Sequence, residues 1–122
     1  MPLNRPLRVL FVCSMNQWRS PTAERLYQND ARLQVRSAGT QRGARRRISR
    51  TDLAWADLVV VMEREHQRAI TRQFPDPSLP PIEILDIPDD YAFLDPELQS
   101  ALTTSIEPVL SLWLDAPPGR TP

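Results

Sequence analysis

The chain has 122 residues and a mass of 14.0 kDa, which is enough for one compact domain and too little for two of ordinary size. Its hydrophobic content of 41% excludes a wholly disordered chain, and no apolar run approaches the roughly 20 residues of a membrane helix. A single cysteine excludes an internal disulfide and a cysteine-rich zinc site. With no apolar signal-peptide core near its start, the sequence predicts a soluble, cytoplasmic protein, with one domain at 1–115 and a loose tail at 116–122.

The charges are unevenly distributed although they sum to zero. Residues 1–60 hold eleven arginines and four acids, whereas residues 61–122 hold four arginines and eleven acids. The basic half could attract an anionic ligand, or the two halves could simply pair across the fold. Charge alone does not separate these two interpretations.

In chain order, the apolar pattern predicts alternating strands and helices. Strands are expected at residues 8–13, 33–38, 58–62 and 82–85, because each is a short run rich in β-branched residues or alternates in polarity. A helix is expected to begin at Ser20-Pro21, with Ser20 as its N-cap, and to fray near Asp30. Further helical segments are expected at 52–56, 63–74 and 97–114, the last with Asp95 placed to cap it.

This alternation predicts an α/β fold with a parallel sheet between layers of helices. Ligands of such sheets bind at the carboxyl ends of the strands. Cys13 stands at the end of the first predicted strand, which makes the loop after it the first place to look for chemistry.

Cys13 and Arg19 are separated by five residues between that strand and the following helix. A loop of this length can curl so that its backbone N–H groups converge on one anion, and the helix N-terminus adds its positive dipole end. A guanidinium at Arg19 can grip two oxygens of a phosphate, and the same positive field favours the thiolate form of Cys13. The spacing indicates a phosphate cradle with a nucleophile at its floor, although a lone cysteine is more often a small buried hydrophobe.

The segment VLFVCSMNQWRSPTAE (9–24) resembles the active-site signature of the low-molecular-weight protein tyrosine phosphatases. Three later segments, VRSAGT (35–40), ADLVVVME (56–63) and IPDDY (87–91), resemble further segments of that family in the same order. The short chain is similar to a compact bacterial branch of predicted phosphatases. The resemblance implies a three-layer, flavodoxin-like domain with four parallel strands in the order 2-1-3-4.

The resemblance also implies a reaction, the hydrolysis of phosphate monoesters, phosphotyrosine first, through a phosphocysteine intermediate. Cys13 would be the nucleophile, and Asp89 the general acid, with Asp90 as the alternative; Asp86 and Asp95 are weaker candidates. Asn16, Ser20 and Ser37 would support the loop. The phosphate-binding residues would be Ser14, Met15, Asn16, Gln17, Trp18, Arg19 and Ser20. No metal and no cofactor is expected.

The chain departs from the family pattern at four points. Met15 stands where the family generally has glycine, and Trp18 stands where many members have a second cysteine. The stretch between residues 40 and 56 is short, and the histidine that completes the family's Asn–Ser–His brace has no counterpart there. Two other functions therefore remain open: a phosphate- or phosphotyrosine-binding module with weak turnover, and a phosphatase of phosphoarginine or small metabolites.

Several further residues have a functional and a structural interpretation. Trp18, Tyr91 and Phe93 could line a substrate cleft or pack inward, and His66 is expected on the surface of its helix. The basic loop could form a rim that recruits a phosphorylated protein, RNA or another polyanion, or could simply be solvated; its arginines are Arg42, Arg45, Arg46, Arg47 and Arg50. No aromatic residues interleave with them, which disfavours nucleic acid. The expected partner is a phosphorylated protein or a small aryl phosphate, with no membrane, and the chain is expected to be a monomer or weak homodimer.

Overall fold

The computed structural model describes residues 5–115, so the tail predicted at 116–122 lies outside the described residues. One parallel sheet contains β1 (Leu7–Cys13), β2 (Leu33–Gly39), β3 (Leu58–Val61) and β4 (Ile82–Ile84). The strand order is β2-β1-β3-β4, which confirms the predicted topology. Each strand lies within one residue of its predicted limits.

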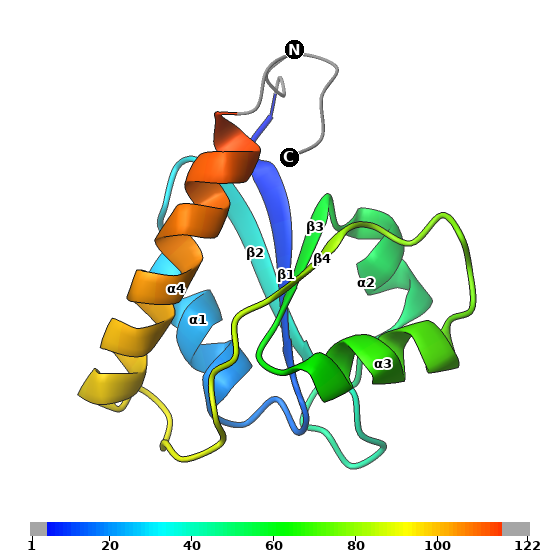
Figure 1. The fold of residues 1–122 in the computed structure, drawn as a ribbon, viewed down its shortest axis with the longest axis horizontal. Coiled ribbons are helices and arrows are strands. Elements are labelled where there is room, and N and C mark those ends of the chain that lie inside the picture. Colours follow the sequence, from blue (N-terminus) through cyan, green and yellow to red (C-terminus); the bar gives the residue numbers. More distant parts are fainter. Residues whose placement is uncertain (1–4, 116–122) are drawn as a thin grey trace.

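Helices cover both faces of this sheet (Figure 1). Figure 1 shows α1 (Arg19–Tyr27) and α4 (Pro96–Leu114) on one side, and α2 (Arg50–Trp55) and α3 (Arg64–Gln73) on the other. Within residues 5–115, no helix has the length and apolar character needed to cross a membrane.

The alternation of side chains along β1 gives the domain two cores. Val9 and Phe11 pack with α1 and α4, whereas Leu10 and Val12 face the α2 and α3 side. On α4, four residues at four-residue intervals are completely buried: Leu98, Leu102, Ile106 and Leu110. Burying each such side chain stabilises the fold by about 1.5–3 kcal/mol, so α4 is held to the sheet mainly by this stripe.

The start of α1 differs from the sequence prediction. The helix begins at Arg19 with Trp18 at the N-cap position, so Ser20 is not the cap and Pro21 is the third helical residue. Proline is tolerated there because the first amides of a helix have no acceptor within it. The predicted cap of α4 is present, since the Asp95 side chain accepts a hydrogen bond from the Glu97 amide at 2.8 Å.

Strand register brings the ends of three strands together. Cys13 at the end of β1 pairs with Gly39 at the end of β2, and Val12 pairs with Val61 at the end of β3. The loops that follow these strands therefore meet at one edge of the sheet, where the candidate site lies.

Candidate active site

The loop from Cys13 to Arg19, called here the 13–19 loop, is held by its carbonyl groups. The carbonyls of Cys13, Ser14 and Met15 accept hydrogen bonds from the amides of Thr40, Gln41 and Arg45, at 3.0, 3.0 and 2.9 Å. Arg45 Nε donates to the Asn16 carbonyl at 3.0 Å. Because C=O and the next N–H point in opposite directions across a trans peptide, four consecutive N–H groups, those of residues 14–17, face away from the 40–45 segment. Consecutive N–H groups on one side of a loop can together bind an anion.

Gly39 allows the two segments to approach this closely. A Cβ on Gly39 would lie 2.6 Å from the Ser14 carbonyl oxygen and 2.6 Å from Ala44 Cβ, so glycine is required by space. A Cβ on Gly43 would meet Met15 Cε at 3.5 Å, which shows that the Met15 side chain lies beside the 40–45 segment. Asn16 has a φ of 56°, in the left-handed region that asparagine adopts more readily than most residues.

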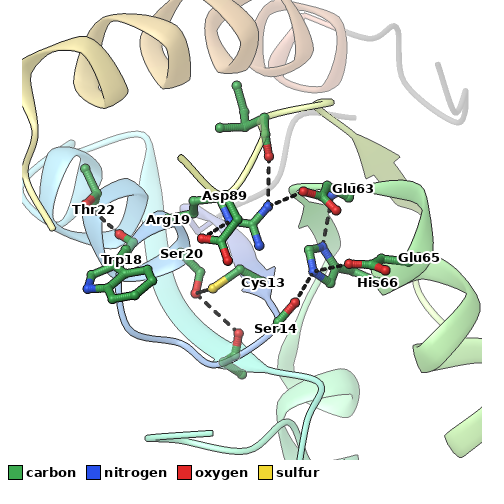
Figure 2. A network of polar contacts seen from close by, with 12 residues as sticks. Cys13, Ser14, Trp18, Arg19, Ser20, Thr22, Glu63, Glu65, His66 and Asp89 are labelled. Atoms are coloured by element: carbon green, nitrogen blue, oxygen red, sulfur yellow. Dashed lines mark hydrogen bonds and ion pairs between the residues drawn. The ribbon is translucent and has the colours of Figure 1, made fainter. Parts of the chain in front are cut away.

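A chain of hydrogen bonds leads to the Cys13 sulfur. Asn16 Nδ2 donates to Ser20 Oγ and to Ser37 Oγ, both at 2.9 Å, and Ser37 Oγ donates to Glu24 Oε1 at 2.5 Å. Ser20 Oγ lies 2.9 Å from Cys13 Sγ (Figure 2). Because Ser20 accepts from Asn16, its own proton can point to the sulfur and stabilise a thiolate.

Glu24 occupies the end of this chain. The bracing histidine that the resemblance implies has no counterpart in the sequence, and here a carboxylate from α1 accepts the Ser37 proton. A carboxylate only accepts hydrogen bonds, so Ser37 donates to Glu24, and the Ser37 oxygen accepts from Asn16 Nδ2.

Arg19 is almost completely buried, with 2% of its surface exposed. Its Nη1 donates to Glu63 Oε1 at 2.7 Å and to the Ile87 carbonyl at 2.8 Å. Arg19 Nε makes no hydrogen bond within the described residues, and Asp89 Oδ1 lies 3.5 Å from it. One edge of the guanidinium is thus fixed by the protein, while a buried donor on the other edge lacks an acceptor.

His66 is not on the surface, and the sequence prediction was wrong. Only 1% of this residue is exposed; Nδ1 accepts the Glu63 amide proton at 3.0 Å and Nε2 lies 2.9 Å from Ser14 Oγ. A ring that accepts at Nδ1 carries its proton on Nε2, which then donates to Ser14. Burial, together with the positive charge of Arg19, lowers the pKa of His66 to about 4.

The turn between β3 and α3 therefore holds both ends of the 13–19 loop. The Glu63 carboxylate binds Arg19 at one end of the loop, and the His66 ring binds Ser14 at the other. Figure 2 shows the two side chains next to each other, joined through the Glu63 amide.

The candidate acids and aromatic residues come from the segment after β4. Asp89 is half-exposed and lies beside Arg19, whereas Asp90 is exposed and makes no ion pair within residues 5–115. Trp18 and Phe93, 43% and 44% exposed, line one open hollow of about 490 Å³ beside the loop. Tyr91 packs partly against the core on the α1 and α4 side, which favours its role as an anchor of the segment.

Three potential metal ligands lie close to the site. Carboxylate oxygens of Glu63 and Glu65 and a ring nitrogen of His66 lie within 4.8 Å of one another. Both ring nitrogens of His66 already have partners, and one Glu63 oxygen binds Arg19. A metal here would have to displace these contacts, so the donors present do not fit a resident metal ion.

Some residues of the site escaped the sequence analysis. Glu63 appears in the sequence prediction only as the last residue of ADLVVVME (56–63), and it lies three residues before His66. That Glu-x-x-His spacing is the signal that could have been used, because it is the spacing of a capping box, here made by the His66 ring. The Ile87 carbonyl left no signal, since any residue provides one.

Several solved structures that are similar to this chain are phosphatases. The chain is similar to the YwlE arginine phosphatase from Geobacillus stearothermophilus, with a TM-score of 0.68, 21% identity, and coverage of 94% of this chain and 100% of that one. It is similar to the low-molecular-weight protein tyrosine phosphatase from T. tengcongensis, with a TM-score of 0.68, 22% identity, and coverage of 86% and 98%. For the tyrosine phosphatase Wzb from Escherichia coli K30 the TM-score is 0.67, the identity 21%, and the coverage 84% and 94%.

These neighbours confirm the fold that the resemblance implied, which is that of the low-molecular-weight protein tyrosine phosphatases. No protein-family model matches the sequence, and the search of curated proteins found no match.

Proposed function

We propose that this chain is a cysteine-dependent phosphate monoester hydrolase that acts first on aryl phosphates such as phosphotyrosine. The observation that carries the proposal is the buried Arg19 Nε, a donor without an acceptor, next to a loop whose amides from residues 14–17 face away from its supports. A bound phosphate would supply acceptors for both. Such donors stabilise charge that develops on the equatorial oxygens during phosphoryl transfer.

In the first step Cys13 Sγ attacks phosphorus, an S–P bond forms and the P–O ester bond breaks. Asp89 gives its proton to the leaving oxygen, because it is the acid that lies beside Arg19. Ser20 Oγ lies 2.9 Å from the sulfur, and a hydrogen bond from this hydroxyl would favour the thiolate form before attack. In the second step a water molecule attacks phosphorus, Asp89 takes its proton, the S–P bond breaks and inorganic phosphate leaves.

Two exposed rings support an aryl substrate. Trp18 and Phe93 line the hollow beside the loop, and flat rings of this kind stack on a phenyl ester. Phosphoarginine is the second candidate, because one of the similar structures is an arginine phosphatase. A substrate panel with a phosphotyrosine peptide, phosphoarginine and a small aliphatic phosphate separates these candidates.

The test of the reaction is hydrolysis of para-nitrophenyl phosphate from pH 5 to 8 in EDTA, by the wild type and by Cys13→Ser. We expect turnover by the wild type and none by the variant. Wild-type turnover that persists in Cys13→Ser would refute the cysteine mechanism. Phosphate binding without turnover in the wild type would instead identify a binding module.

A further inference from the structure

A second hollow lies on the other side of the 13–19 loop, between the 40–47 segment and α3. It has a volume of about 580 Å³ and is called here the arginine hollow, because four arginines line it: Arg42, Arg47, Arg68 and Arg72. Glu65 is its single acidic residue. The charge of its lining is therefore strongly positive, in a molecule whose net charge is zero.

The four arginines are distinguished from their neighbours by their contacts. Arg45 and Arg46 support the fold, since Arg45 binds the Asn16 carbonyl and Arg46 binds the Ser37 carbonyl and Asp52. None of the four arginines of the hollow makes an ion pair within residues 5–115. The basic loop predicted from the sequence thus divides into residues that hold the structure and residues that present charge.

The arginine hollow adjoins the candidate active site at Ser14 and His66. Ser14 and His66 belong to its lining, and Ser14 directly follows Cys13 in the 13–19 loop. A peptide that carries the phosphorylated residue would therefore reach the arginines with a segment that passes Ser14, while the aryl ring itself lies toward Trp18 and Phe93. Unpaired guanidinium groups bind carboxylates and phosphates in a bidentate manner.

We infer that the arginine hollow binds an acidic peptide segment next to the phosphorylated residue, so that the substrate is an acidic phosphoprotein. This inference rests on the proposed function, whose substrate class it narrows. Carboxylates of the segment would pair with Arg42, Arg47, Arg68 and Arg72. A nucleic acid fits the hollow less well, because its lining contains no aromatic side chain on which a base could stack.

The test compares two phosphotyrosine peptides of one sequence, with Asp and Glu flanking the phosphotyrosine in the first and Asn and Gln in the second. Their affinities for Cys13→Ser are measured by fluorescence anisotropy at 50 mM and 300 mM salt. We expect the acidic peptide to bind about ten-fold more tightly at low salt and to lose most of this advantage at high salt. In Arg68→Ala/Arg72→Ala the affinity ratio of the two peptides should fall to about two.

Arg64→Ala is the matched control, because Arg64 is exposed on the same helix and does not line the hollow. It should leave the affinity ratio unchanged. Equal affinities of the two peptides for the unmutated hollow, or an equal loss in Arg64→Ala, would overturn the inference. So would tighter binding of a single-stranded RNA than of the acidic peptide.

Failure of the proposed function is recognised separately. The binding measurement does not require turnover, whereas hydrolysis of para-nitrophenyl phosphate tests the chemistry without engaging the hollow. Selective binding of the acidic peptide without any hydrolysis would support the inference about the arginine hollow and refute the proposed phosphatase activity. Hydrolysis of the aryl phosphate together with equal affinities for the two peptides would support the phosphatase activity and refute the inference about the arginine hollow.

Discussion

Replacement of His66 by glutamine should remove a pH dependence of stability that the wild type has. In the folded protein His66 is neutral, because its Nδ1 accepts the Glu63 amide proton and the ring is buried. Its pKa is lowered to about 4 by burial and by Arg19, against the opposing effect of Glu63 and Asp89. In the unfolded chain the same ring has an ordinary pKa of about 6.5.

Between pH 6.5 and pH 4 the unfolded chain therefore binds a proton that the folded chain does not. The free energy of unfolding therefore rises with pH in this window, and the stabilisation that His66 contributes is lost as the pH falls. At about 1.4 kcal/mol per pH unit, the wild type should lose about 3 kcal/mol between pH 6.5 and pH 4 through this one group. Above pH 6.5 the contribution to the slope vanishes, because the ring is neutral in both states.

The assay is urea unfolding from pH 4.5 to 7.5, with and without His66→Gln, both in a Cys13→Ser background so that no thiol titrates. His66 is the only histidine, so no other imidazole contributes to the slope. At pH 7 the glutamine variant should be less stable by about 1–3 kcal/mol, since a buried amide and a hydroxyl lose their partner. Its curve should approach that of the parent as the pH falls. If the free energies of unfolding of the parent and the variant differed by a constant amount from pH 7.5 to 4.5, His66 would not be a neutral, buried imidazole in the folded protein.

Three further predictions concern the site. Ser37→Ala should lower the free energy of unfolding by about 1–3 kcal/mol in urea titrations, because the Asn16 amide is left buried without this acceptor; an unchanged midpoint would contradict the hydrogen-bond chain. Asp89→Ala should reduce phenyl phosphate turnover by about 100-fold or more and para-nitrophenyl phosphate turnover far less, because only the poor leaving group needs a proton; a larger effect of Asp90→Ala would move the role to that residue. Gly39→Ala should raise the dissociation constant for inorganic phosphate in calorimetry, because its Cβ would meet the Ser14 carbonyl oxygen at 2.6 Å; unchanged binding would show that the loop can shift.

The strands of the sheet were predictable because each is a locally encoded apolar run. β3 is a run of four buried residues, Leu58–Val61, and such a segment has few alternatives to a central parallel strand. The position of Cys13 at a carboxyl end followed from the same pattern. Locally coded signals also sufficed for the Asp95 cap, whose acceptor and amide lie two residues apart.

His66 was not predictable in the same way. Its helix, REHQRAITRQ, is dominated by polar residues, and its own turn does not determine whether the histidine faces water. The ring is buried because Ser14, 52 residues away, lies against it. The predicted start of α1 was wrong for a related reason, since the Ser20 hydroxyl contacts Cys13 Sγ and the Ala38 carbonyl and does not cap a helix amide. Long-range partners decided both cases.

The attachment of the segment after β4 bears on whether the proposed reaction needs a loop movement before proton transfer. The amides of Leu85 and Ile87 donate to the carbonyls of Val61 and Met62, at 2.9 and 2.8 Å, and the Ile87 carbonyl accepts from Arg19. Asp89 thus lies two residues beyond Ile87, which is hydrogen-bonded both to the sheet and to the Arg19 guanidinium. As the general acid of the proposed reaction, Asp89 would already lie beside Arg19, and no loop closure would be needed before it donates its proton. No conformational change would then limit kcat, and solvent viscosity would slow only the diffusion of substrate and product into and out of the site.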